Sequence, residues 1–113
     1  MWNSVAVEVQ FTAAAHRALL VQMAVAEVMG VELGRIGDHI RGDPKSALAR
    51  QVAMYLCRMA FEMNLSQIGQ AFGRDRHTVR HALQRVEDLR EDREFDRAIA
   101  WLESSLRRIG GRP

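Results

Sequence analysis

Apolar residues recur along this chain at intervals of three and four residues, the spacing that marks one face of an α-helix. The pattern predicts helices over residues 12–29, 45–63, 65–72, 76–89 and 93–109. Gly30 is placed to end the first helix and Pro44 to open the second, and the glycine-interrupted stretch 31–40 is expected to form one or two turns. We therefore expect an all-α domain of five or six helices, with no sheet of any size.

Two adjacent helices form a predicted helix-turn-helix. Leu65, Ile68 and Phe72 fall on one face of the first helix. Gly73 is the residue type that tolerates a left-handed helix end. Asp75 can accept backbone N–H bonds at the start of the next helix. The motif is thus expected to turn at Gly73 and to resume at Asp75.

The second helix of this motif has an apolar stripe and a basic outer face. The stripe consists of Val79, Ala82, Leu83, Val86 and Leu89. The outer face begins with Arg76, His77, Arg80 and His81. A helix in the DNA major groove presents its N-terminal residues to base edges, and arginine, histidine and threonine can contact bases there. We expect DNA contact from this face; the alternative is a solvated surface that only keeps the helix soluble.

Composition and charge indicate what kind of domain this is and how it can bind DNA. The chain has 113 residues, 48% of them apolar and only 6% aromatic, which suits a single helical domain packed by aliphatic side chains. The formal net charge is +2, and Lys45 is the sole lysine. Because this charge attracts DNA only weakly at long range, binding depends on the local arginine cluster between Arg74 and Arg90.

The remaining sequence features concern disulfide bonds, cellular location and domain boundaries. Cys57 is the only cysteine, so no intramolecular disulfide can form. Neither a signal peptide nor an apolar stretch of membrane-spanning length is evident, and we expect a cytoplasmic protein that does not enter a membrane. Residues 12–109 are assigned to the domain, 1–11 to an N-terminal segment and 110–113 to a loose tail. Trp2 and the alternating valines of the N-terminal segment either pack on the domain or pair with another chain.

The central helix and the motif carry a family resemblance. It rests on the runs Ala49–Leu56 and Leu65–Asp75 and on Thr78, Val79, His81 and Ala82. These residues are similar to the C-terminal DNA-binding domain, domain IV, of the bacterial replication initiator DnaA, and the likeness covers most of the chain from about Ala18 onward. It implies double-stranded DNA as partner, at a DnaA-box-like site, in replication-initiation control or transcription regulation. No GxxxxGK[ST] phosphate loop occurs, so no nucleotide is expected.

The family pattern at the turn is Phe-Gly-Gly-Arg-Asp-His-Thr-Thr-Val-x-His-Ala. Here one residue fewer precedes Arg74, and Arg76 and His77 stand where the family has histidine and its first threonine. The resemblance implies base contacts from Asp75, Arg76, His77 and Thr78. The candidates for backbone or minor-groove contacts are Arg41, Lys45, Arg50, Arg74, Arg80 and His81. The loop before the central helix is less basic than in the family, with Arg41 and Lys45 as its only cations.

Two other functions compete with DNA binding. An adaptor would keep the fold but bind a protein of the initiation machinery, such as an initiator-inactivating regulator, with little direct DNA binding. An enzyme is less favoured: His77 and His81 could share a metal on one helix face, but no HExxH glutamate or third ligand lies nearby in sequence. We therefore predict no catalytic residue, no metal site and no cofactor.

Overall fold

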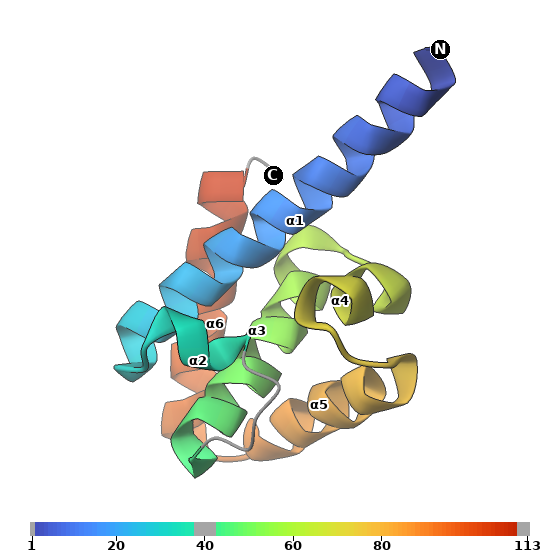
Figure 1. Cartoon of the computed structure of the whole chain (residues 1–113). Helices are drawn as coiled ribbons and strands as arrows, with labels where there is room; N and C mark the ends of the chain where they lie inside the picture. The colour runs from blue at the N-terminus through green and yellow to red at the C-terminus, as the bar shows by residue number, and fades with distance from the viewer. Residues whose placement is uncertain (1, 38–42, 111–113) are drawn as a thin grey trace.

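The computed structural model describes residues 2–37 and 43–110, and for residues 2–12 the backbone alone. These residues form six helices and no strand (Figure 1). The helices are α1 (Trp2–Met29), α2 (Leu33–Ile36), α3 (Pro44–Phe61), α4 (Leu65–Phe72), α5 (Arg76–Leu89) and α6 (Arg93–Gly110). The all-α prediction is confirmed, and both helices of the predicted motif have their predicted bounds. None of the described helices is long and apolar enough to cross a membrane.

Helix α3 is the centre of the domain and contacts each of the other five helices. Pro44 occupies its first turn, as the sequence predicted. Asp43 caps the helix by accepting a hydrogen bond from the Ser46 N–H at 3.0 Å. Its end comes two residues before the expected Met63, because Glu62 adopts the left-handed conformation, with φ of 55°. The α3 residues that are almost fully buried include Val52, Ala53, Leu56, Cys57 and Ala60, which makes α3 the core helix.

Helix α1 is longer than its sequence pattern indicated. It begins at Trp2, so the expected start at Thr12 is wrong. No glycine or proline lies between these positions to interrupt a helix. Ala18, Val21 and Val25 bury one side of its C-terminal half against the domain, and the N-terminal turns extend beyond the other helices (Figure 1).

Helix α6 closes the domain on the side of α3 away from the turn of the motif. Ile99, Leu102 and Leu106 are its buried residues. The helix includes Gly110, which the sequence pattern had placed in the tail, and the chain there passes directly over the Phe61 ring. A Cβ at Gly110 would overlap the Phe61 ring, so only glycine fits without a shift of the ring. Residues 111–113, the rest of the predicted tail, lie outside the described residues.

A polar cluster joins α3, α5 and α6 on the surface of this core. The Tyr55 hydroxyl donates to Glu87 Oε2 at 2.7 Å and accepts from Arg90 Nη1 at 3.0 Å. Arg90 also donates from Nε to Asp96. These bonds connect one residue of the central helix to the end of α5 and the first turn of α6, and so fix the orientation of α5.

Candidate nucleic-acid interface

Helix α4 is defined at both ends by local hydrogen bonds. Asn64 and Gln67 form a capping box at the start of α4, with Asn64 Oδ1 accepting from Gln67 N at 2.8 Å and Gln67 Oε1 from Asn64 N at 2.9 Å. At the other end Gly73 has φ of 63°, and the Arg74 N–H donates to the Gly69 carbonyl at 2.9 Å. The prediction that Gly73 ends the helix in a left-handed conformation is confirmed.

Gly69 is a residue of α4, packed against the turn, that the sequence pattern alone did not single out. A Cβ at position 69 would lie 2.6 Å from the backbone oxygen of Arg74, a separation that real Cβ atoms do not reach. The absence of a side chain therefore lets the chain fold back across α4 directly after Gly73. The available signal was a glycine in the middle of a short amphipathic helix, where its low helix propensity points to a close backbone approach.

Helix α5 begins with the cap that its sequence predicted. Asp75 Oδ1 accepts a hydrogen bond from the Thr78 N–H at 2.7 Å, and this bond lowers the pKa of the Asp75 carboxyl below its ordinary value. Ile68 and Phe72 of α4 and Val79 of α5 are buried between the helices. With this face turned inward, the opposite face of α5 is left to solvent.

That outer face carries the predicted contact residues. Arg76, His77, Thr78, Arg80 and His81 are all exposed, as is Asp75. The rings of His77 and His81 have their centroids 4.5 Å apart and are tilted by 58°. This pair brings two potential metal ligands together, but no group of three or more metal-binding side chains occurs within the described part of the chain.

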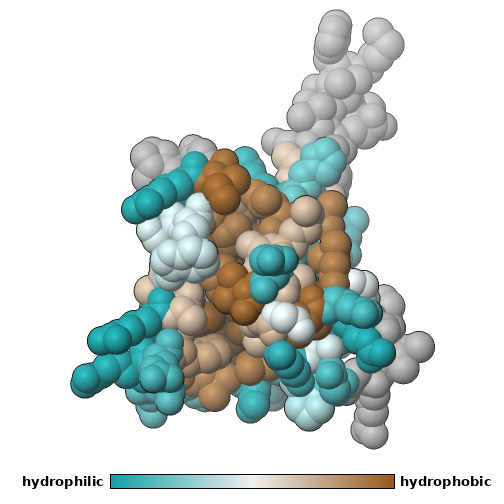
Figure 2. Space-filling model, turned by 90° about the vertical axis from the view of Figure 1, so that its left-hand side faces the viewer, coloured by the Kyte–Doolittle hydropathy of each residue, from teal (hydrophilic) through white to brown (hydrophobic). Residues whose placement is uncertain are grey.

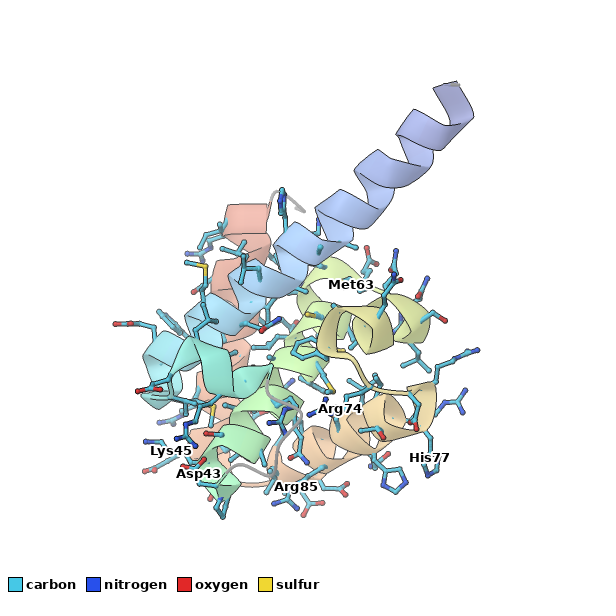
Figure 3. The ribbon with its side chains drawn as sticks, in the orientation of Figure 1. Asp43, Lys45, Met63, Arg74, His77 and Arg85 are labelled. Atoms are coloured by element: carbon cyan, nitrogen blue, oxygen red, sulfur yellow. The ribbon has the colours of Figure 1, made fainter. Side chains whose placement is uncertain are left out.

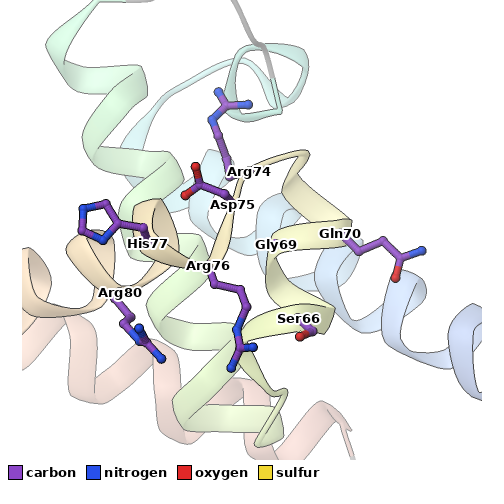
Figure 4. A pocket seen from close by; sticks show the side chains of 8 residues that line it. All are labelled: Ser66, Gly69, Gln70, Arg74, Asp75, Arg76, His77 and Arg80. Atoms are coloured by element: carbon purple, nitrogen blue, oxygen red, sulfur yellow. The ribbon is translucent and has the colours of Figure 1, made fainter.

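A shallow hollow, open to solvent, lies where the turn meets the first turn of α5 (Figure 4). Its lining comes from Ser66, Gly69 and Gln70 of α4 and from Arg74, Asp75, Arg76, His77 and Arg80. In Figure 4, Arg76 and Arg80 project from α5 in the same direction, whereas Arg74 projects to the other side of the turn. Three arginines around one carboxylate make this a locally cationic surface, as a phosphate-bearing ligand requires.

Arg74 also has a structural role in the turn. Its Nη1 donates to the carbonyls of Phe72 and Gly73 at 3.2 and 3.4 Å. These are carbonyls at the C-terminal end of α4, which have no partner within the helix. The side chain is half-buried, unlike the exposed Arg76 and Arg80.

Comparison with known proteins agrees with this geometry. The family model for the bacterial dnaA protein helix-turn-helix matches residues 19–86. This chain belongs to the DnaA helix-turn-helix family. It is a DNA-binding domain of that family, and its α4 and α5 are the two helices of the motif.

Relatives of known identity cover this DnaA-type domain but extend far beyond it. The chain is 40% identical over 72 residues to the chromosomal replication initiator protein DnaA of Mycobacteroides abscessus. That alignment covers 58% of this chain and 15% of the relative. The crystal structure of a DNA replication initiation factor has a TM-score of 0.79 and 29% identity, over 89% of this chain and 31% of that chain.

Two of the other predicted backbone contacts of this DnaA-type domain, Lys45 and Arg50, are not among the residues that line the hollow. Lys45 is exposed at the first turn of α3, and Figure 3 shows it beside Asp43 at the opposite side of the molecule from His77. Arg50 donates from Nε to the Ile36 carbonyl at 2.8 Å and from Nη2 to the Arg35 carbonyl at 3.2 Å, so its guanidinium holds the end of α2. Arg41 lies outside the described residues. The structure therefore brings together residues 74–81, places Lys45 apart from them and engages Arg50 with α2.

Proposed function

We propose that this protein binds double-stranded DNA in a sequence-specific manner, with the first turn of α5 in the major groove, and that it acts in the control of replication initiation. The observation that carries this proposal is the exposed group of Arg76, His77 and Arg80 at the N-terminus of the second helix of a DnaA-family motif. The N-terminal end of a helix also carries a partial positive charge that favours phosphate. Since the chain spans 15% of the DnaA protein it matches, its place in replication is inferred from the family.

The exposed side chains divide into two groups by their position. Arg76, His77 and Thr78 occupy the first turn of α5, the part of a recognition helix that reaches base edges. Arg80 lies one turn further along α5 and projects in the same direction as Arg76. From there it can contact the DNA backbone. The Asp75 carboxylate accepts a hydrogen bond from the Thr78 N–H, which fixes the conformation of this turn. The same carboxylate can also accept a hydrogen bond from a cytosine amino group.

The DNA site is expected to be DnaA-box-like with its own preferences. Arg76 and His77 are the two side chains that depart from the pattern the chain otherwise resembles. Both are exposed at the reading end of α5. An arginine in this position favours guanine, whose O6 and N7 it can contact with two hydrogen bonds. Selection of bound sequences from random duplex DNA would identify the preferred site directly.

The decisive experiment compares charge reversals on and off the proposed interface. Arg80→Glu is expected to weaken binding to all sequences by a similar factor. Because this variant cannot neutralise its phosphate, the slope of log affinity against log salt should also decrease by about one unit. Arg97→Glu is the matched control, because Arg97 is likewise exposed but lies on α6. If the two variants bind DNA alike, α5 is not the DNA-binding element, and the adaptor alternative becomes the better explanation.

A further inference from the structure

Two histidines lie side by side on the outer face of α5. His77 and His81 are separated by one helical turn, so they project from the helix only about 40° apart. Their ring centroids are 4.5 Å apart, the ring planes are tilted by 58°, and both side chains are exposed. Two histidines with this spacing on one helix face also hold the zinc ion of the HExxH motif. The two rings therefore have the arrangement of a pair of metal ligands.

The spacing of this pair is a departure from the pattern that the chain otherwise resembles. In Phe-Gly-Gly-Arg-Asp-His-Thr-Thr-Val-x-His-Ala the two histidines are five positions apart, and a helix turns such residues about 140° away from each other. Here Arg76 stands at the first of those positions and His77 at the next, so the interval to His81 is four. The shared face is thus a property of this chain.

We propose that His77 and His81 together bind one zinc ion through a nitrogen of each ring. Imidazole nitrogen is a good ligand for zinc, nickel and copper, whereas magnesium prefers oxygen. The sequence argued against a metal centre because no third ligand lies nearby, and no group of three metal-binding side chains occurs in the part of the chain that the structure describes. An ion with two protein ligands instead keeps water at its other positions, and it exchanges more readily than a structural zinc with four protein ligands.

The charges next to the pair are mixed. The pKa of the Asp75 carboxyl is lowered mainly by its hydrogen bond with Thr78 and also by the charge of His77, so an acidic group lies near the pair. Figure 4 shows the His77 ring projecting away from Arg76, and Arg80 projects in the direction of Arg76. These guanidinium groups therefore leave the outer side of the His77 ring open to an ion.

The surroundings of the pair suit a hydrated ion bound with moderate affinity. The outer face of α5 is polar, unlike the left-hand side of the molecule in Figure 1, where apolar side chains make up much of the surface (Figure 2). Arg85, one turn beyond His81, is exposed and its charge opposes a cation. We therefore expect a dissociation constant in the micromolar range.

Metal binding has a consequence for DNA recognition, and this consequence rests on the proposed function. A His77 nitrogen that binds zinc cannot at the same time bond to a base edge, and the hydrated ion occupies space in front of the first turn of α5. Zinc and the specific DNA site therefore compete. Each lowers the affinity of the protein for the other by the same factor.

The test is zinc binding to the full chain without DNA, measured by isothermal titration calorimetry. We expect binding in the micromolar range, no comparable binding of magnesium, and at least about a tenfold loss of zinc affinity in His81→Ala. His16→Ala is the matched control, because His16 is also exposed but has no histidine or cysteine one turn away on α1. This control should bind zinc like the parent.

The sharpest variant exchanges two neighbouring residues. Arg76→His combined with His77→Arg keeps composition and charge but moves the histidines from four to five positions apart. It should lose zinc affinity as His81→Ala does, and unchanged circular dichroism would show that it is folded. Zinc binding as tight as that of the parent in either variant, or no binding by the parent up to about 100 µM zinc, would overturn the proposed site.

Titration of a selected duplex with and without zinc tests the competition. Zinc should raise the dissociation constant of the parent for DNA several-fold, and a chelator should reverse the effect. In His81→Ala zinc should have no effect relative to the metal-free affinity of that variant. A parent that binds zinc with unchanged DNA affinity would overturn the competition. A chain that binds zinc but no DNA would overturn the proposed function and leave the metal site standing, so the two failures are distinguishable.

Discussion

At the scale of single residues, Arg76 and His77 carry the proposed specificity. Both are exposed at the start of α5 and neither packs in the core. Arg76→Ala and His77→Ala are therefore expected to reduce the preference for a selected DNA site by about 1–3 kcal/mol each while leaving the thermal unfolding midpoint in place. Competition binding with specific and random duplexes measures this preference for the selected site. Parent-like discrimination in both variants would show that other residues read the bases.

The hydrogen bond that Asp75 accepts makes the stability of the fold depend on pH, again through a single residue. Its hydrogen bond with the Thr78 N–H lowers the folded-state pKa below the ordinary value of 3.8. A lowered folded pKa means that this carboxylate stabilises the fold at pH values above 3.8, and that the contribution disappears as the pH falls through the folded pKa. Asp75→Asn keeps an oxygen acceptor but cannot titrate there. Its unfolding midpoint should fall less steeply than that of the parent on acidification below about pH 4; equal slopes would exclude a role for this cap.

At the scale of elements, the motif depends on close approach between α4 and the turn. Gly69→Ala places a Cβ against the Arg74 carbonyl oxygen, and since backbone must move, we expect the free energy of unfolding to decrease by about 1–3 kcal/mol. Gly34→Ala is the control, because no atom lies within 4 Å of a Cβ at that position in α2. Chemical denaturation gives the free energy of unfolding of each variant for this comparison. Equal stability would mean that the turn relaxes without cost.

At the scale of the whole molecule, Tyr55 links the central helix to both α5 and α6. Its hydroxyl accepts from Arg90 and donates to Glu87, and burial together with the Glu87 hydrogen bond raises the pKa of Tyr55. Tyr55→Phe removes these bonds and should cost about 0.5–1.5 kcal/mol of stability without changing the DNA salt slope. Gln84→Ala removes only an exposed side-chain bond to Asp88 and should stay within about 0.5 kcal/mol of the parent. A Tyr55→Phe chain as stable as the parent would show that the cluster does not hold α5.

The helices and the motif were predictable from the sequence because their signals are local. Apolar spacing, the proline at position 44, the Asp75 cap and the glycine at position 73 each act within one or two turns of chain, and all appear in the structure as expected. Whether cations from other segments join this arginine cluster was not predictable in this way, since it depends on residues distant in sequence. Tertiary packing directs Arg50 to the carbonyls of α2, places Lys45 away from the hollow, and brings Gly69 against the turn. Packing likewise buries one side of α1 and exposes the other, because periodicity places residues on a face but does not say what covers it.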